Sequence, residues 1–197
     1  MNTEKTIVAI SSSPSKGRNS DSMLDAFIKG VKEQEPNVNI EKIYLIDLNI
    51  DHYCFENSTG FSEHEKEFAS LANKIKNADG LIISTPTYNF SVPACLKNLI
   101  DRLRFVALDM TKRNILGQPT GQLNKLNLFF LVSGGTPKWQ QRFIFFIYPA
   151  FWLRIVFAYY GSRKIKSYYS GNTKTFENKN ILNKCQKLSK KFIKSIK

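Results

Sequence analysis

The sequence has little material for metal or disulfide chemistry. It contains three cysteines and two histidines among 197 residues, and Cys54, Cys95 and Cys185 are widely separated, with no CxxC pair. One cysteine is left over from any single disulfide, so this usage favours a reducing, cytoplasmic compartment. It also excludes a cysteine-only zinc or iron–sulfur site within one chain. Residues 51–56 bring together acidic residues, a histidine and a cysteine. Their spacing is not that of the ligands of a closed metal site, so we expect a surface loop and no metal.

Uninterrupted apolar runs of membrane-spanning length and nucleotide-binding motifs are also absent. The first residues, MNTEKTIVAI, lack the apolar length of a secretory signal. The aromatic stretch Phe143–Tyr160 approaches the length of a membrane span, but Pro149 and Arg154 interrupt it, and we expect no stable membrane insertion. Neither GxxxxGK[ST] nor GxGxxG occurs, so neither a nucleoside triphosphate nor a separately bound dinucleotide is indicated.

Acidic residues are scarcer than basic ones, and the imbalance is greatest near the C-terminus. The chain has 29 lysines and arginines against 16 acids, a net charge of +13. From Ser162 to Lys197 there are eleven basic residues and one acid, Glu177. Such a tail indicates either the solvated face of a terminal helix or contact with an anionic membrane or nucleic acid. We favour the solvated face and expect no nucleic-acid partner.

Apolar segments with strand and helix periodicity alternate five times along the chain. No repeat or low-complexity linker breaks the alternation, which predicts a single α/β domain over residues 1–197 with a doubly wound parallel sheet in three layers. A loop is expected over Asp109–Gln122. The expected strands are Thr6–Ile10, Asn39–Ile46, Leu81–Ser84, Leu126–Val132 and Lys164–Tyr169. The expected helical segments are 23–31, 63–77, 96–105, 149–160 and a basic C-terminal helix over about 176–196.

The aromatic helical segment over about 139–160 has more apolar surface than one sheet face covers. We expect a helix from Pro149 to Tyr160 that ends at Gly161. Its surplus apolar side chains could line a pocket for an aromatic acceptor, form a dimer interface or touch a membrane. A plain buried helix would have the same composition.

Two polar loops follow expected strands at their carboxyl ends, where open α/β sheets bind ligands. Residues 11–22 are rich in serine and lead into a helix, whose free N–H groups and dipole favour an anion, helped by Lys16 and Arg18. Residues 85–91 hold hydroxyl, amide and aromatic side chains that suit a flat heterocycle. A serine-rich capping turn and an ordinary strand–helix connection would explain the same residues.

The second loop also resembles a known family. Residues 85–93, TPTYNFSVP, followed by Leu96-Lys97-Asn98 and Ile100-Asp101-Arg102, look like the isoalloxazine-binding segment of the flavodoxin-like NAD(P)H-dependent FMN reductases. Ser13, Pro14, Asn19 and Ser20 match the flavin-phosphate loop of that family, although Ser12 and Ser15 stand where glycine and arginine are common. The resemblance implies a flavodoxin-like five-stranded parallel sheet in the order 2-1-3-4-5, with FMN at the switch point, as in flavodoxin itself.

The same resemblance implies a set of cofactor-binding residues. The phosphate would lie on the first loop, the isoalloxazine edge on the second, and residues 133–136 at the end of the fourth strand would close the other side. Glycines in that third loop allow close approach of a ligand. The implied residues are Ser11, Ser13, Ser15, Asn19, Ser20, Pro86, Thr87, Tyr88, Asn89, Phe90, Ser91, Ser133, Gly134, Gly135 and Thr136.

The activity that the resemblance implies is hydride transfer from NAD(P)H, as co-substrate, through bound FMN to a flavin, quinone, azo or nitro compound in a ping-pong sequence. The flavin carries that chemistry, so we name no catalytic acid or base. A cytoplasmic homodimer is expected. Two alternatives are a flavodoxin-like electron carrier, which the net charge of +13 disfavours, and a module that its basic tail attaches to membrane or nucleic acid.

Overall fold

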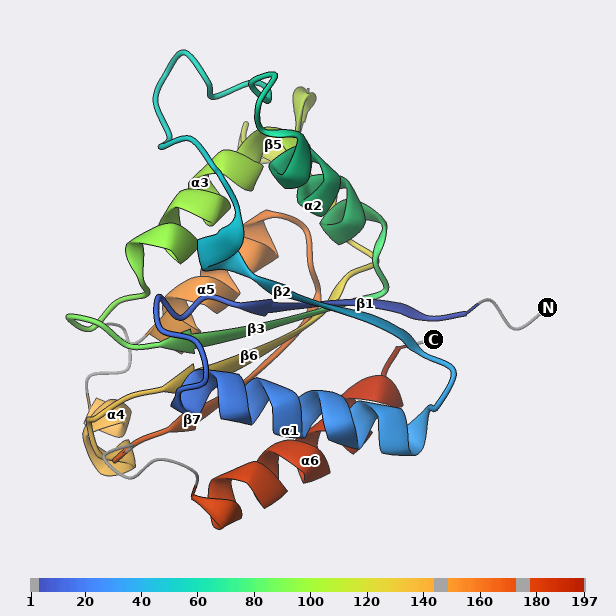
Figure 1. The fold of residues 1–197 in the computed structure, drawn as a ribbon. Helices are drawn as coiled ribbons and strands as arrows, with labels where there is room; N and C mark the ends of the chain where they lie inside the picture. The colour runs from blue at the N-terminus through green and yellow to red at the C-terminus, as the bar shows by residue number, and fades with distance from the viewer. Residues whose placement is uncertain (1–3, 144–148, 173–177, 197) are drawn as a thin grey trace.

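The fold is built on a five-stranded parallel sheet (Figure 1). The computed structural model describes residues 4–143, 149–172 and 178–196. The sheet strands are β1 (Thr6–Ser11), β2 (Asn39–Tyr44), β3 (Gly80–Pro86), β6 (Asn127–Ser133) and β7 (Lys164–Ser170). Their order, β2-β1-β3-β6-β7, is 2-1-3-4-5 when only these strands are counted, which confirms the expected flavodoxin-like fold class.

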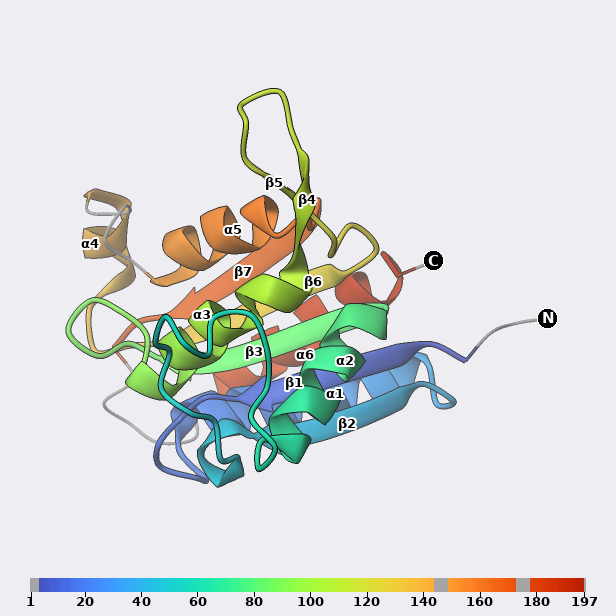
Figure 2. The same ribbon diagram turned by 90° about the horizontal axis from the view of Figure 1, so that it is seen from above.

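Helices cover both faces of the sheet, as Figures 1 and 2 show. One layer holds α1 (Asn19–Gln34) and α6 (Lys179–Ile193), and the other holds α2 (Lys66–Asn77), α3 (Ala94–Ala107) and α5 (Pro149–Tyr159). A 3-10 turn, η1 (Leu45–Asp47), follows β2, and a short helix, α4 (Lys138–Phe143), follows β6. Within the described residues, no helix is long and apolar enough to cross a membrane.

A hydrophobic core lies on each face of the sheet, because successive side chains along a strand point to opposite faces. Ile7 and Ala9 of β1 pack toward α1 and α6, whereas Val8 and Ile10 pack toward α2, α3 and α5. Because both faces of the central strands are buried, those strands read as continuous apolar runs in the sequence. Gly30 lets α1 and α6 approach closely, since a Cβ there would lie 2.3 Å from the Ser189 hydroxyl oxygen.

The prediction of a loop without secondary structure over Asp109–Gln122 is wrong, because an antiparallel hairpin forms there. β4 (Leu108–Arg113) pairs with β5 (Pro119–Gly121), and the hairpin projects from the body in Figure 2. Its turn is held by Asn114, whose side-chain oxygen accepts the N–H groups of residues 116 and 118. The two strands are short and largely exposed, so they leave no apolar alternation to detect.

The remaining differences from expectation concern the ends of elements. The aromatic helix is α5, and residues 144–148 of the aromatic segment lie outside the described residues. The basic helix begins at Lys179, capped by the Asn178 side chain, and residues 176–177 also lie outside the described residues. β2 ends at Tyr44, two residues before the expected end at Ile46, and the η1 turn begins at Leu45.

A buried ion pair holds the long segment between η1 and α2. Arg102 of α3 and Glu65 are both fully buried, and Nη2 and Oε2 lie 2.5 Å apart. Arg102 also donates to the carbonyls of Asn57 and Gly60, while the Glu65 carboxylate accepts the N–H groups of residues 51 and 62. One arginine therefore fixes the segment 48–65 over α3.

We expect Arg102→Met to destabilise the protein strongly. Removing one partner of a buried ion pair leaves an uncompensated charge, which typically costs about 3–5 kcal/mol of the free energy of unfolding. Urea denaturation measures the loss. Lys97→Ala serves as the control, because Lys97 pairs with Asp101 at an exposed i,i+4 position, where the loss should stay below about 1 kcal/mol. Equal losses in the two variants would contradict this account.

Candidate functional site

The three loops expected to form the site all lie at the carboxyl edge of the sheet, on the left of Figure 1. Parallel pairing sets Ser11 of β1 beside Ser84 of β3, and Pro86 beside Ser133 of β6. The connections continue past the strands, since Ser12 N donates to the Ser84 carbonyl at 2.9 Å and Thr87 N to the Ser133 carbonyl at 2.8 Å. This edge includes the switch point between β1 and β3, where the chain order reverses.

The first loop ends in a helix terminus without a side-chain cap. Arg18 occupies the N-cap of α1 and makes no side-chain cap hydrogen bond. The first-turn N–H groups of a helix have no partner within the helix, so such a terminus suits an anion. The Ser20 hydroxyl oxygen is buried and has no hydrogen-bond partner within the described residues. An uncapped terminus beside an unsatisfied hydroxyl fits a phosphate group.

An internal carboxylate, which sequence reasoning missed, shapes this loop. Asp21 is 1% exposed and accepts hydrogen bonds from the Ser11 hydroxyl and, at 2.6 Å, from Gly17 N. Gly17 has φ +69°, a left-handed conformation that favours glycine. An acid in the first turn of an expected helix was the available signal. Ser13 and Ser15 form a smaller turn, in which Ser15 N donates to the Ser13 hydroxyl at 3.2 Å.

The two cations of the first loop lie differently from each other. Lys16 pairs with Asp47 at 2.6 Å and lies 4.7 Å above the Tyr44 ring, so its charge is already partnered. Arg18 is exposed at the N-cap. Of the two residues expected to strengthen an anion site, Arg18 is therefore the one whose position at the helix terminus suits that role.

The second loop contains a tight turn in an uncommon conformation. Tyr88 and Ser91 exchange both backbone hydrogen bonds at 2.9 Å, and Asn89 and Phe90 between them have φ +49° and +62°. Asparagine tolerates this region, but a bulky residue there is an outlier that marks strain or function. Phe90 is 56% exposed, so no packing explains its conformation. The N–H groups of Asn89 and Phe90 make no hydrogen bond within the described residues.

The third loop is fixed from the side by Tyr169 of β7. The Tyr169 hydroxyl donates to the Thr136 carbonyl at 2.8 Å, and Gly134 N donates to the Ser170 carbonyl at 2.9 Å. Gly134 leaves room for this contact, since a Cβ there would lie 2.6 Å from the Tyr169 hydroxyl oxygen and 3.2 Å from the Thr87 hydroxyl oxygen. That Thr87 oxygen is buried and has no partner within the described residues, a second unsatisfied hydroxyl at this edge.

Cys95 joins the first two loops at the start of α3. Its thiol donates to the Ser12 carbonyl, with sulfur and oxygen 3.4 Å apart. Burial raises the pKa of the Cys95 thiol above its usual value, so it stays protonated and able to donate at neutral pH. Among the described residues, no group of three or more histidine, cysteine or acidic side chains could hold a metal ion.

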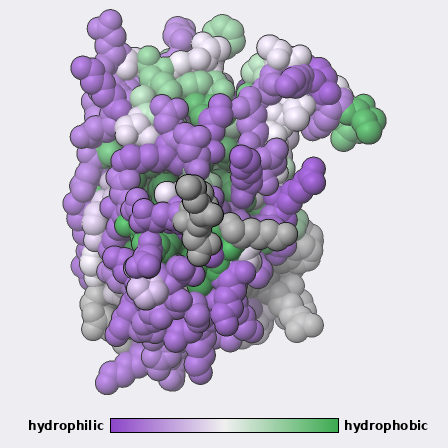
Figure 3. Space-filling model, turned by 90° about the vertical axis from the view of Figure 1, so that its right-hand side faces the viewer, coloured by the Kyte–Doolittle hydropathy of each residue, from purple (hydrophilic) through white to green (hydrophobic). Residues whose placement is uncertain are grey.

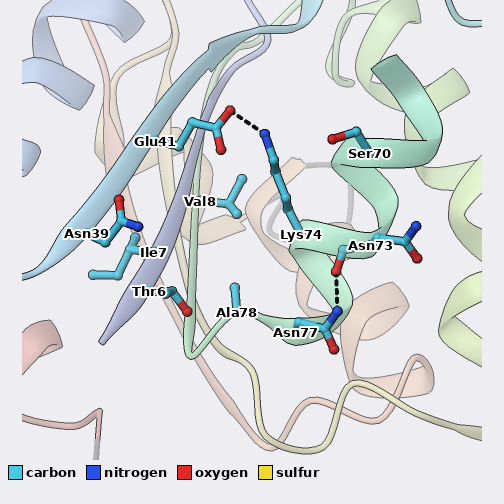
Figure 4. A pocket seen from close by; sticks show the side chains of 10 residues that line it. All are labelled: Thr6, Ile7, Val8, Asn39, Glu41, Ser70, Asn73, Lys74, Asn77 and Ala78. Atoms are coloured by element: carbon cyan, nitrogen blue, oxygen red, sulfur yellow. Dashed lines mark hydrogen bonds and ion pairs between the residues drawn. The ribbon is translucent and has the colours of Figure 1, made fainter. Parts of the chain in front are cut away.

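A cavity of about 460 Å³ lies away from this edge, between β2 and α2 (Figure 4). Its floor includes Val8 and Ala78, and the Glu41–Lys74 ion pair, 2.6 Å long, spans it. Thr6 and Asn39, which also line it, begin their strands, so the cavity opens near the amino ends of β1 and β2. It contains none of the expected site residues, and we assign the site to the carboxyl edge.

Comparisons with known proteins agree with this fold and identify a family. Residues 6–138 match the family model described as NADPH-dependent FMN reductase. The chain is 32% identical over 128 residues to FMN-dependent NADH:quinone oxidoreductase 1 of Mesoplasma florum, covering 64% of each chain. It is 31% identical over 140 residues to FMN-dependent NADH:quinone oxidoreductase of Metamycoplasma arthritidis, covering 68% of this chain and 70% of that one. The matched part thus spans just under two thirds of the first relative's length.

Solved structures share the fold over nearly the whole chain. Azoreductase from Bacillus anthracis str. Sterne superposes with a TM-score of 0.74 at 17% identity, covering 97% of this chain and 99% of that one. An FMN-dependent NADH-azoreductase of the Ames Ancestor strain, solved in complex with FMN, gives 0.74 at 17% identity and covers 97% and 98%. At these identities the likeness concerns the fold alone.

We expect Gly134→Ala to disturb the third loop and Gly135→Ala to leave it intact. A Cβ at Gly134 displaces the Tyr169 hydroxyl, whereas one at Gly135 meets no atom within 4 Å. Crowding of this kind typically costs about 1–3 kcal/mol of the free energy of unfolding. Urea denaturation of both variants checks it, and a loss in Gly135→Ala as large as that in Gly134→Ala would contradict the assigned contact.

Proposed function

Because the chain belongs to the NADPH-dependent FMN reductase family, we propose that it is an FMN-dependent oxidoreductase that transfers hydride from NAD(P)H to a small acceptor. The observation that carries the proposal is the pair of unsatisfied hydroxyls, Ser20 and Thr87, buried at the carboxyl edge of the sheet. Buried polar groups are normally hydrogen-bonded, so unpaired ones indicate a ligand that completes them.

The first loop would hold the phosphate of FMN. The uncapped start of α1 supplies N–H groups and the positive end of the helix dipole. Ser20 would donate its unpaired hydroxyl, and Arg18 would contribute charge from the N-cap. Ser13 and Ser15 form a turn of the same loop, Asn19 begins α1, and Ser11 would act through its bond to Asp21.

The second loop would bind the edge of the isoalloxazine ring. In the turn 88–91, Ser91 N is already bonded to the Tyr88 carbonyl, so the N–H groups open to a ligand are those of Asn89 and Phe90. Fixed donors of this kind stabilise negative charge that develops on a ring during reduction. Residues 86–87 and the third loop, 133–136, would enclose the ring from the sides.

The chemistry that FMN supplies when bound is acceptance of a hydride from NAD(P)H and its passage to a second substrate, a ping-pong sequence. The residues of this chain bind and orient the ring and donate hydrogen bonds to it. We assign no side chain as acid or base. Quinones are the acceptors we favour, by analogy with the names of the sequence relatives, and azo, nitro and free flavin compounds are further candidates.

We further propose that the enzyme works as a cytoplasmic homodimer. The hairpin β4–β5 exposes Ile115 and Leu116, at 103% and 81%, and α5 exposes Ile155, at 53%. Apolar side chains exposed to this extent support an interface with a second copy. Three free cysteines support a reducing compartment. The partner copy would cover apolar surface of α5 that sheet packing leaves open.

We expect Ser20→Ala to weaken FMN binding without weakening riboflavin binding. Loss of one hydrogen bond to a charged group costs roughly 1.5–3 kcal/mol, or about 10- to 150-fold in the dissociation constant. Riboflavin lacks the phosphate, so its affinity should be unchanged. Quenching of flavin fluorescence on titration with apoprotein measures both constants.

The control for this experiment is Ser58→Ala. The Ser58 hydroxyl donates to the Phe55 carbonyl in the exposed segment before α2 and belongs to none of the three candidate loops, so both flavins should keep their wild-type affinity. A parallel fall in FMN and riboflavin affinity in Ser20→Ala would place the phosphate elsewhere. The thermal midpoint of Ser20→Ala should equal that of the wild type, because its hydroxyl has no hydrogen bond to lose within the residues that the structure describes.

We expect the purified protein loaded with FMN to be reduced by a nicotinamide cofactor. Under anaerobic conditions, NADPH or NADH should bleach the visible flavin absorption, and a quinone added afterwards should restore it. The two steps test electron donor and acceptor separately. Binding of FMN without bleaching by either cofactor would contradict the enzyme and support a flavodoxin-like electron carrier.

A further inference from the structure

Helix α6 presents lysines along one side and contains no acidic residue. Its five lysines, together with Lys194 at the C-cap, fall within an arc of about 140° when successive residues are placed about 100° apart. All six are exposed. In the described part of the chain, Lys190 pairs with Glu33 at 3.2 Å, and the other five make no ion pair. We call this side the lysine face; its residues are Lys179, Lys184, Lys187, Lys190, Lys191 and Lys194.

The lysine face is held rigidly by the opposite side of the helix. Cys185, Phe192 and Ile193 of α6 are buried, and burial raises the pKa of Cys185 to about 12. α1 and α6 pack in close contact at Gly30. Because the helix cannot turn about its axis without exposing this core, the lysines stay on the surface. Their mutual repulsion is therefore a fixed property of the folded protein.

Neighbouring elements extend the positive surface. Lys29 and Lys32 are exposed on α1, the helix that packs against α6. On β7, Ile165 packs toward the opposite core, so the alternate residues Lys164 and Lys166 lie on the α6 side of the sheet. Lys164 Nζ reaches the Ser195 carbonyl, just beyond the end of α6, at 3.3 Å. The lower part of Figure 3, over the ends of α1 and α6, is accordingly hydrophilic.

The composition of this surface favours lipid headgroups over nucleic acid. Every cation on the lysine face is a lysine, a flexible point charge, and none is an arginine, whose planar fork pairs with phosphates in fixed geometry. The face has no exposed aromatic side chain on which bases could stack. Clusters of four to eight lysines on a helix are typical of attraction to anionic lipid surfaces.

We propose that the lysine face is a docking surface for an anionic lipid bilayer. Binding is peripheral and electrostatic, because the face itself carries no apolar anchor. α1 and α6 cover a face of the sheet, whereas the candidate flavin site lies at its carboxyl edge (Figure 1). The docked protein therefore keeps its site open to solvent and close to acceptors dissolved in the bilayer.

The test is co-sedimentation of the full chain with vesicles. We expect binding to vesicles of phosphatidylglycerol and phosphatidylcholine, no binding to pure phosphatidylcholine, and loss of binding at about 0.5 M salt, where charges are screened. The triple variant Lys184→Glu, Lys187→Glu and Lys191→Glu should bind the anionic vesicles at least about tenfold more weakly. Its FMN affinity should match that of the wild type, and its thermal midpoint should be no lower, because the substitutions relieve repulsion between lysines.

A matched control separates this face from net charge. Lys66, Lys76 and Lys125 are exposed, belong to α2 and to the loop before β6, and have no ion pair within the described residues. Their replacement by glutamate changes the net charge by the same amount and should leave vesicle binding near the wild-type level. Equal loss in both triple variants would overturn the proposal, as would a wild-type protein that ignores anionic vesicles. Tighter binding to duplex DNA than to vesicles at the same salt would also overturn it and assign the face to nucleic acid.

Discussion

The parallel register of β1, β3 and β6 is the constraint on which the site depends. Parallel strands end at a common edge, so segments separated by more than a hundred residues, such as 11–22 and 133–136, reach the same edge on either side of the end of β3. The hydrogen bonds from Ser12 N and Thr87 N carry this register beyond the strands and into the loops. A change that moved one strand by a residue would separate the loops and turn its side chains to the opposite face.

The sheet, its order and the edge that carries the candidate site could be predicted because they depend on local patterns. Apolar strand runs and amphipathic helices are visible in any window of the sequence, and topology rules restrict how five such pairs assemble. Pro93 and the polar residues before it marked the second loop, and the serines marked the first. Those signals specify where a ligand would bind but leave the direction of each side chain open.

The features that could not be predicted rest on contacts between distant residues or on uncommon backbone conformations. Nothing near Arg102 in the sequence indicates a buried partner 37 residues away at Glu65. Tyr169 fixes the third loop from a neighbouring strand, across 33 residues to Thr136. Phe90 takes positive φ, against the usual preference of a bulky residue. Each is a property of the assembled structure rather than of a local sequence pattern.

The position of Asp21 explains how the first loop can be ordered before a ligand binds. A carboxylate in the first helical turn is favoured by the helix dipole, and here it also fixes Gly17 and Ser11. Because the protein supplies this anion itself, a phosphate that bound as proposed would meet a preformed turn and need little reorganisation. The same carboxylate would repel the phosphate and so limit how tightly the loop could hold it. Under this proposal, the order of the loop and the strength of phosphate binding are opposed at one residue, and the charge of Arg18 at the helix terminus would partly offset the repulsion.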